Sequence, residues 1–474
     1  VCPHAAIRPV AMTEAEAAEA PAALDMTGMK EYKFAIAVSA LDCTGCGSCA
    51  NVCPGKKGAK ALAMENMEAN VASQKFFDYA VTLPEKEDVI AKFKENTVKG
   101  SQFKQPLLEF SGACAGCGET PYAKLITQLF GDRMYIANAT GCSSIWGNSS
   151  PSTPYTVNAK GQGPAWSNSL FEDNAEFGYG MLLAQKAIRD GLKTKVEAVM
   201  ESEKASDEVK AACKEWIDTF SVGATNGAAT DKLVAALEGC ECDTCKDIVK
   251  NKDFLAKKSQ WIFGGDGWAY DIGFGGVDHV LASGKDINIM VFDTEVYSNT
   301  GGQSSKSTPT GAIAQFAAGG KETKKKDMAS IAMSYGYVYV AQISMGADFN
   351  QTVKAIAEAE AYPGPSLIIA YAPCINHGIK KGMSKAQTEE ELAVKCGYWH
   401  NFRFNPAAEN KFSLDSKTPD MENYMDFLNG EVRYNSLQRQ NPEKAARLFA
   451  KNENEAKERY TYLNKLITLY GKED

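Results

Sequence analysis

The sequence predicts an α/β protein with a mostly parallel sheet and flanking helices, preceded by a small, cysteine-rich α+β segment. Between about residues 112 and 400, short β-rich runs alternate with helical ones, the order typical of parallel sheets. A tight group of cysteines lies before residue 60. The chain has 474 residues, and single cores rarely grow past about 250–300 residues, so we expect more than one domain.

The strands expected most clearly are 260–264, 287–293, 337–343 and 366–371. Each is followed by a loop that contains Gly, Ser or Pro, and active-site residues in such sheets follow the carboxyl ends of strands. The stretch 183–258 has helical periodicity and is expected to be an inserted helical excursion with a solvated charged face. A carboxy-terminal extension, 401–474, ends in a helix with Asn441 as its cap and Pro442 at its first position.

The composition is that of a soluble globular protein and excludes several classes. The net charge is −8, and no Lys/Arg stripe with interleaved aromatics suggests nucleic acid as a partner. No apolar run approaches the roughly 20 residues of a membrane span, and no secretory signal opens the chain, so a cytoplasmic location is expected. Fourteen cysteines then indicate metal binding or redox work. The opening VCPHAAIRPV has no initiator Met, and we expect a piece of a longer protein.

The first cysteine group has the C-x2-C-x2-C-x3-C-P spacing of bacterial 4Fe-4S ferredoxins, in CTGCGSCANVCP. Cys2-Pro3 has the form of the end of a preceding identical motif, so Cys2 is expected to complete the cluster held by Cys43, Cys46 and Cys49. Cys53 would be the lone remaining ligand of a further cluster whose other ligands precede residue 1. A zinc site is a minor alternative, since zinc favours two pairs with a longer spacer. Residues 1–100 should thus form a partial two-cluster ferredoxin-like α+β domain.

A second motif follows two of the expected strands. WIFGG leads into Asp266, Gly267 and Trp268, and the next strand leads into TEVYSNTGGQ at 294–303. Glycines let backbone amides approach a diphosphate, and a carboxylate there can hold a hard divalent ion. The arrangement resembles the G-D-G plus downstream Asn signature of thiamine-diphosphate enzymes, although G-D-G alone can be an ordinary strand-to-helix turn. We assign Asp266, the Thr294 hydroxyl and the Val296 carbonyl as Mg²⁺ ligands. Thr294 replaces the usual Asn, as in 2-oxoacid oxidoreductases.

A third cysteine group surrounds the same sheet edge. Cys114 and Cys117 form a CxxC, Cys142 follows, and a cubane needs a fourth thiolate. We choose Cys374 because it follows the strand SLIIAYA. The other candidates are Cys213, Cys396, Cys240, Cys242 and Cys245. We expect the last three to be free thiols or a local disulfide, and Cys213 and Cys396 to be buried apolar residues. His377 either faces the active site or is structural.

Over the whole chain the sequence resembles the pyruvate:ferredoxin (flavodoxin) oxidoreductases, in VCPHAAIRPV, CTGCGSCANVCPG, CAGCGETPY, NATGCSSIW, GDGWAYDIGFGG, DTEVYSNTGGQSSKSTPTGA and YAPCINHG. The resemblance implies that 101–400 is a thiamine-diphosphate-binding domain with its own 4Fe-4S cluster on Cys114, Cys117, Cys142 and Cys374. Glu119 and Cys142 would touch the cofactor, and the Asn299 amide would face the substrate, so Asn299 and Cys142 are the catalytic candidates. The residues that would line the cofactor are Gly265, Asp266, Gly267, Trp268, Thr294, Glu295, Val296, Tyr297, Ser298 and Asn299.

The same resemblance implies an activity. Pyruvate would be decarboxylated oxidatively with coenzyme A to acetyl-CoA and CO2, reversibly, and 4Fe-4S clusters would pass the electrons to ferredoxin or flavodoxin in anaerobic metabolism. The full-length protein would be a homodimer, and this chain alone would be inactive, because family residues that activate thiamine lie in an amino-terminal part. One alternative is the β-type subunit of an oxidoreductase for another 2-oxoacid. Another is a pure electron carrier, which would not need the motifs at 260–303.

Overall fold

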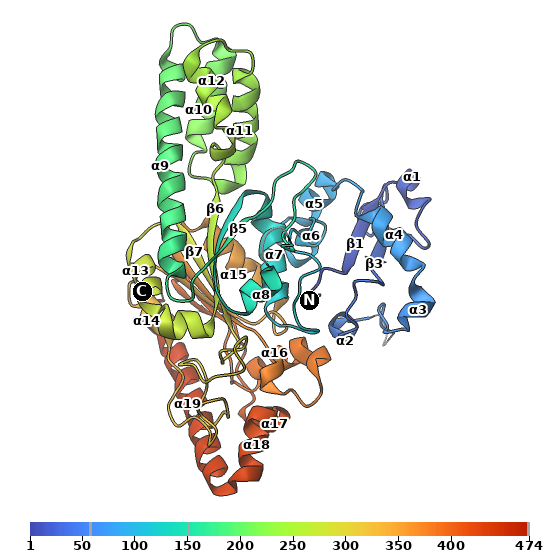
Figure 1. The fold of residues 1–474 in the computed structure, drawn as a ribbon, viewed down its shortest axis with the longest axis vertical. Helices are drawn as coiled ribbons and strands as arrows, with labels where there is room; N and C mark the ends of the chain where they lie inside the picture. Colours follow the sequence, from blue (N-terminus) through green and yellow to red (C-terminus); the bar gives the residue numbers. More distant parts are fainter. Residues whose placement is uncertain (56–58, 149–151, 472–474) are drawn as a thin grey trace.

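The computed structural model describes residues 1–55, 59–148 and 152–471. A central sheet carries helices on both faces, and a small second sheet is formed by the amino-terminal residues (Figure 1). Four helices form a projection at one end of the central sheet. A helical carboxy-terminal region packs at the opposite end. Among these residues, no helix is both long and apolar enough to cross a membrane.

The central sheet has eight strands in the order β11-β10-β8-β9-β7-β6-β4-β5. All neighbours from β8 to β5 are parallel, and β10 and β11 join antiparallel at one edge. The α/β class with a mostly parallel sheet is therefore confirmed. The strands are β4 Met134–Ala139, β5 Ala165–Ser169, β6 Ser259–Gly265, β7 Ile287–Asp293, β8 Tyr339–Ile343, β9 Pro365–Tyr371, β10 Phe402–Phe404 and β11 Phe412–Leu414.

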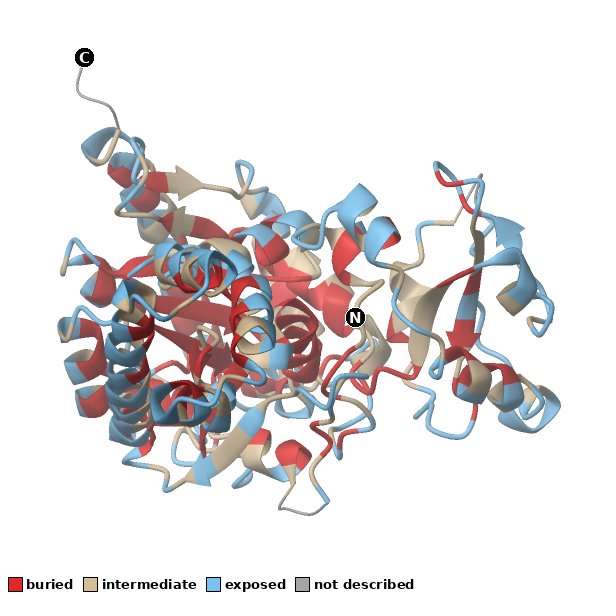
Figure 2. Ribbon diagram, turned by 90° about the horizontal axis from the view of Figure 1, so that it is seen from above, coloured by how far each residue is buried: buried red, intermediate tan, exposed pale blue. Residues whose placement is uncertain are grey.

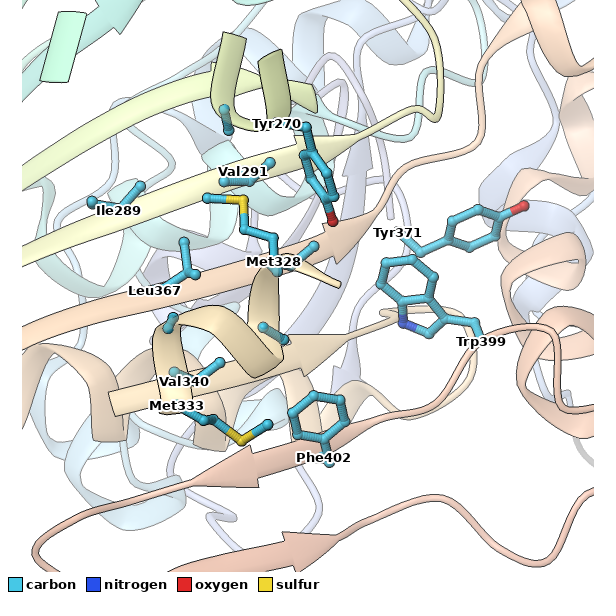
Figure 3. Packing of buried hydrophobic residues seen from close by; sticks show 14 of the residues in the cluster. Tyr270, Ile289, Val291, Met328, Met333, Val340, Leu367, Tyr371, Trp399 and Phe402 are labelled. Atoms are coloured by element: carbon cyan, nitrogen blue, oxygen red, sulfur yellow. The ribbon is translucent and has the colours of Figure 1, made fainter. Parts of the chain in front are cut away.

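The middle strands are buried on both faces, so their sequences are almost continuously apolar. Every residue of β7 and β9 is buried, and Figure 2 shows burial concentrated in this sheet and the helices on it. Ile289 and Val291 face one side, where they pack with Met328 and Leu367 (Figure 3). Met290 belongs to the core on the other side. The first core includes helices α13 Phe274–Ala282 and α14 Met328–Met333, and the second includes α7 Thr120–Phe130 and α15 Phe349–Ala361.

The helical excursion is longer at its start than the predicted 183–258. Its helices are α9 Asn174–Glu201, α10 Asp207–Asp218, α11 Gly223–Leu237 and α12 Asp243–Lys250. The first half of α9 contacts β4 and β6, which explains the earlier start: it is anchored on the main sheet. The second half contributes Leu192 and Val196 to a separate core with Trp216, Leu233 and Ile248.

The amino-terminal region is built on a three-stranded antiparallel sheet of order β1-β3-β2. Its strands are β1 Ile7–Met12, β2 Leu24–Asp25 and β3 Lys33–Val38, and its helices are α1 Glu14–Ala17, α2 Ser48–Val52, α3 Met67–Asn70, α4 Ser73–Ala80, α5 Glu87–Phe93 and α6 Val98–Ser101. Met12 packs against Phe76 and Phe77 of α4. Cys43 and Cys46 lie in the loop after β3, Cys49 lies in α2, and Cys53 directly follows α2.

The carboxy-terminal helices complete the sheet's covering. They are α16 Ala386–Lys395, α17 Tyr424–Gly430, α18 Val432–Gln440 and α19 Pro442–Leu469. The Asn441 side chain accepts a bond from the Lys444 amide, so the predicted cap and Pro442 start are confirmed. Leu448 and Leu463 of α19 join the main core, because the amphipathic helix buries its apolar stripe there.

Candidate functional site

The three loops that carry the predicted site meet at one edge of the central sheet. Strands β6, β7 and β9 are adjacent and parallel, so their carboxyl ends lie side by side. Asp266 follows β6 and precedes the π-helix Gly267–Ile272, Thr294 follows β7, and Cys374 follows β9. The helix α8 Cys142–Gly147 follows β4 at the same edge.

Three oxygen atoms converge where magnesium ligands are predicted. The Thr294 hydroxyl oxygen lies 3.0 Å from Asp266 Oδ1 and 3.0 Å from the Val296 carbonyl oxygen. Adjacent oxygens around an octahedral Mg²⁺ at 2.0–2.1 Å are about 2.9 Å apart. The three groups therefore have a spacing that suits one magnesium ion. The Ser305 hydroxyl donates to Asp266 Oδ2 at 2.6 Å and holds the carboxylate in place.

The electrostatics of Asp266 also fit a cation. Its side chain is 1% exposed, and burial together with the nearby Asp293 raises the pKa of Asp266 well above its ordinary value. The nearby ammonium of Lys325 is already paired with Asp293 at 2.8 Å and Glu295 at 2.9 Å. A buried carboxylate is costly unless a charge offsets it. A divalent ion beside Asp266 would supply that charge.

Gly265 provides the close approach that a diphosphate needs. A Cβ at this position would meet only the Phe292 carbonyl oxygen, at 3.9 Å, so its backbone faces open space. Trp268, which was expected to line the cofactor, is fully buried in the main core. Within the G-D-G-W segment, the backbone and Asp266 are thus the parts available to a ligand.

The loop after β7 rests on a buried ion-pair network. Glu295 has a positive φ of 61°, and its carboxylate pairs with Lys325 at 2.9 Å and Arg433 at 2.8 Å and accepts from the Tyr398 hydroxyl at 2.6 Å. Although burial opposes it, these two cations lower the pKa of Glu295 to about 2. The Glu295 side chain therefore anchors the loop, and only its backbone is left for a cofactor.

His377 supports the same loop by contacting its backbone. It is fully buried, and its Nε2 lies 2.7 Å from the Thr294 carbonyl oxygen. Burial lowers the pKa of His377 to about 3, so the ring is neutral and donates this bond. The sequence left two roles open for His377, and its contact with the Thr294 carbonyl supports the structural one.

The four cysteines assigned to the second cluster come from three separated segments. Cys114 and Cys117 lie in the loop before α7, Cys142 begins α8, and Cys374 follows β9. Burial raises the pKa of Cys374 to about 11, with Glu119 and Cys114 adding to the rise. Burial and Glu119 also raise the pKa of Cys142, with further contributions from Cys374 and Cys117. The four thiols are thus close enough to affect one another.

A glycine allows the CxxC loop to reach Cys374. A Cβ at Gly118 would lie 2.5 Å from the backbone nitrogen of Pro373, so any side chain there would separate the two segments. The bond from the Gly118 amide to the Pro373 carbonyl, 3.1 Å, fixes this contact.

The cysteine group and the diphosphate loop share two polar residues. The Ser298 hydroxyl lies 3.1 Å from the Cys142 sulfur. The Asn376 amide lies 3.6 Å from the Cys374 sulfur and donates to the Ser298 carbonyl at 3.2 Å. The two sites are therefore one continuous assembly.

Glu119 and Asn299 lie at opposite extremes of burial. Glu119 is 3% exposed and accepts from the Trp146 indole at 2.7 Å, and burial raises its pKa to about 7. Asn299 is exposed on the loop after β7. Its predicted contact with substrate remains a prediction.

The ferredoxin-like cysteines form a second group. Burial raises the pKa of Cys49, and Cys2, Cys46 and Cys43 add to the rise, so Cys2 does lie with the three loop cysteines. Cys53 interacts with other partners: although desolvation opposes it, the backbone amides beyond the cysteine lower its pKa.

The two cysteine groups are joined through the segment after Cys374. The Asn51 amide, which lies between Cys49 and Cys53 in sequence, donates to the Ser384 carbonyl at 2.8 Å. A Cβ at Gly116 would lie 2.5 Å from the Met383 carbonyl oxygen, so the CxxC loop touches the same 3-10 turn, Met383–Lys385. One short turn thus contacts both cysteine loops.

Sequence reasoning missed several supporting residues. Ser305 lay inside a quoted motif without a role, and Asn376 lies two residues after a predicted ligand. Lys325 and Arg433 had no local signal, because only the fold brings them beneath the loop.

The comparisons with known proteins first define a class. The thiamine pyrophosphate enzyme family, C-terminal TPP binding domain, matches residues 249–370, a range that contains Asp266 and Thr294. Residues 249–370 are therefore similar to a thiamine-diphosphate-binding domain.

The relatives narrow this class, and the predicted resemblance to pyruvate:ferredoxin (flavodoxin) oxidoreductases is confirmed. The chain is 57% identical over 99% of its length to a pyruvate-flavodoxin oxidoreductase of Enterobacter agglomerans. It is 56% identical over 98% of its length to a pyruvate:ferredoxin oxidoreductase of Moorella thermoacetica. In both cases it spans only 40% of the relative's length. A solved 2-oxoglutarate:ferredoxin oxidoreductase of Magnetococcus marinus aligns with 56% of this chain and 65% of its own, at 14% identity and a TM-score of 0.32.

Proposed function

We propose that this chain is the part of a pyruvate:ferredoxin (flavodoxin) oxidoreductase that holds thiamine diphosphate with Mg²⁺ and passes electrons through 4Fe-4S clusters. The observation that carries the proposal is the sharing of Ser298 and Asn376 between the predicted diphosphate loop and Cys142 and Cys374. An enzyme that only decarboxylates needs no thiolates beside its cofactor. An electron carrier needs no diphosphate site.

The chain's own residues have distinct tasks in this proposal. Asp266, Thr294 and Val296 would hold Mg²⁺, and Gly265 lets the backbone approach a diphosphate. Glu295, fixed by Lys325 and Arg433, holds the loop in the conformation that presents these ligands. Such preorganisation removes reorganisation from the reaction.

Bound thiamine diphosphate supplies the carbon nucleophile and electron sink for decarboxylating a 2-oxoacid. The thiolates of Cys114, Cys117, Cys142 and Cys374 would hold a 4Fe-4S cluster beside that site, and such a cluster would supply a one-electron acceptor. The turn Met383–Lys385 then provides a protein contact toward the group of Cys2, Cys43, Cys46 and Cys49. Electrons would leave through this second cluster and a further one that uses Cys53.

The substrate, acceptor and assembly follow from the relatives' names and the sequence resemblance. Pyruvate and coenzyme A are the proposed substrates, ferredoxin or flavodoxin the acceptor, and a homodimer the assembly. Because the chain spans 40% of its relatives' length, we expect it not to oxidise pyruvate alone, even with cofactors supplied. The β-type subunit of an oxidoreductase for another 2-oxoacid is the second candidate. The ferredoxin-like region fused before the thiamine domain favours the first.

Asp266→Ala tests the proposed cofactor site, since it removes the charged metal ligand. Calorimetry with thiamine diphosphate and Mg²⁺ should detect no binding to the variant, while the cluster on Cys2, Cys43, Cys46 and Cys49 keeps its spectrum. Asp286→Ala is the matched control. Asp286 lies just before β7, at the opposite end of the strand that leads to Thr294, and pairs with Lys257 on the surface. Unchanged thiamine binding in Asp266→Ala would refute the placement.

A further inference from the structure

A third group of cysteines lies far from both cluster sites in the fold. Cys240, Cys242 and Cys245, in the sequence CECDTC, connect α11 to α12 in the helical projection. Helix α12 runs back along α9, because Arg189 binds the Leu255 carbonyl near the sheet and Lys195 pairs with Asp247 further out. The cysteines therefore lie at the outer end of the projection (Figure 1).

The geometry of this group differs from that of the cluster cysteines. The three sulfurs all lie within 4.8 Å of one another, and those of Cys242 and Cys245 are 2.9 Å apart. Across the described ranges no other group of three or more His, Cys, Asp or Glu residues is gathered this closely. Sulfurs around one tetrahedral metal ion at 2.3 Å are about 3.8 Å apart. A cubane instead binds each sulfur to a different iron. The three thiols are gathered closely enough for a single ion, which would move the Cys242 and Cys245 sulfurs apart from 2.9 Å to that spacing.

The surroundings favour a thiolate at Cys242 and leave one side of the group accessible. Cys242 caps α12, where its sulfur accepts from the Cys245 amide at 3.2 Å, and the positive end of a helix stabilises thiolate. Cys245 is buried against the core of the projection and Cys240 is half-buried, whereas Cys242 is exposed. The nearby Glu241 is paired with Lys246. The protein thus offers three sulfur ligands and an outer position open to solvent.

We infer that Cys240, Cys242 and Cys245 bind one thiophilic d10 cation, Zn²⁺ or Cu⁺, that closes the outer end of the helical projection. Soft thiolate ligands select these ions. Each thiol that coordinates releases its proton to solvent, and no electron transfer is involved. The ion would join the end of α11 to the start of α12, where the projection has only its own small core. Its position, away from the sheet edge, gives it a structural role and not an electron-transfer one.

The test uses the anaerobically purified chain with its iron-sulfur clusters reconstituted. Zn²⁺ is added in one arm and Cu⁺ in the other, excess metal is removed, and X-ray absorption at the zinc or copper edge reports the ligands. We expect about one ion per chain with three sulfur neighbours in at least one arm, which identifies the ion. The variant Cys240→Ser/Cys242→Ser/Cys245→Ser should lose that ion and keep its iron.

Two further variants keep the result interpretable. Cys242→Ser changes only the exposed thiol, so it should fold even if the triple variant does not, and should lose one sulfur neighbour or the ion. Cys213→Ala removes a buried thiol from the same core and should retain the metal. The proposal is overturned if neither ion binds, if Cys242→Ser keeps both the ion and the wild-type number of sulfur neighbours, or if mass mapping finds a Cys242–Cys245 disulfide in the anaerobic protein.

Discussion

The two cysteine groups assigned to clusters are built in opposite ways. In the ferredoxin-like region, three of the four thiols lie between residues 43 and 49 in one loop, and only Cys2 comes from elsewhere. At the sheet edge, the four thiols come from segments between residues 114 and 374 and meet only because β4 and β9 end at the same edge. The first group depends on local spacing, and the second depends on the whole α/β domain.

This difference has a physical consequence. A local loop closes cheaply, whereas a long-range site depends on the order of everything between its ligands. The amount of iron retained at the sheet edge therefore measures whether the α/β domain, including the predicted cofactor loop, is folded. Iron in the ferredoxin-like loop reports mainly on that loop.

The largest expected effect is the loss of one whole cluster. The proposed assignment gives the chain complete ligand sets for two cubanes, so about eight irons are expected. Cys374→Ser should reduce this to about four, with the ferredoxin-like cluster left intact. Iron and acid-labile sulfide analysis with electron paramagnetic resonance would measure both.

Cys245→Ser is the control for this change, since that thiol belongs to the projection and not to the sheet edge. It should leave the iron content unchanged. Loss of a cluster in Cys245→Ser but not in Cys374→Ser would reverse the assignment, and about twelve irons in the wild type would overturn the ligand count.

A smaller effect is expected where the two regions meet. Glu390 is fully buried beside the amino terminus, where it accepts from the Tyr122 hydroxyl and the Gly346 amide. Burial raises the pKa of Glu390 to about 8. A carboxyl with a raised pKa stabilises the fold below its unfolded pKa, near 4.5, and that contribution is lost as pH rises through about 8.

Glu390→Gln mimics the protonated carboxyl and should remove this dependence. The neighbouring Gln387 can turn its unpaired Oε1 toward the new amide. We expect the variant to unfold like wild type near pH 5 and to be more stable near pH 8.5, by on the order of 3 kcal/mol, in urea titrations. Glu391→Gln, at a partly exposed neighbour paired with Lys395, should not change the dependence of stability on pH. Equal pH dependence in wild type and Glu390→Gln would contradict the assignment.

The sequence predicted the strands well and the supporting contacts poorly. Strand β7 was predicted to the residue, because a strand buried on both faces is apolar throughout and ends in polar loop residues. The position of Asp266, Thr294 and Cys374 at one edge of the sheet could be predicted because each follows such a strand. The proximity of Cys2 to the loop cysteines could be predicted because the motif that it is expected to complete has a fixed spacing.

Contacts between distant segments could not be predicted in this way. Nothing near Glu295 in sequence indicates that Arg433 neutralises it, or that its side chain turns away from the predicted cofactor. The helical excursion was expected to begin at 183, because periodicity cannot show that the first turns of α9 pack on β4 and β6.

The smallest expected effect concerns the residue that joins the cofactor loop to the sheet-edge cluster. The Asn376 amide lies 3.6 Å from the Cys374 sulfur, and hydrogen bonds to ligand sulfurs stabilise the more negative, reduced cluster. Asn376→Ala should keep all the iron and lower the midpoint potential of that cluster alone. A hydrogen bond worth about 1 kcal/mol corresponds to on the order of 40 mV for one electron.

Asn51→Ala is the control, because it removes a comparable amide from the Ser384 contact beside the other cysteine group. It should leave the midpoint potential of the sheet-edge cluster unchanged. Redox titration followed by electron paramagnetic resonance separates the two clusters. An unchanged potential in Asn376→Ala would show that the amide does not act on the sulfur, and that the two sites are joined through Ser298 alone.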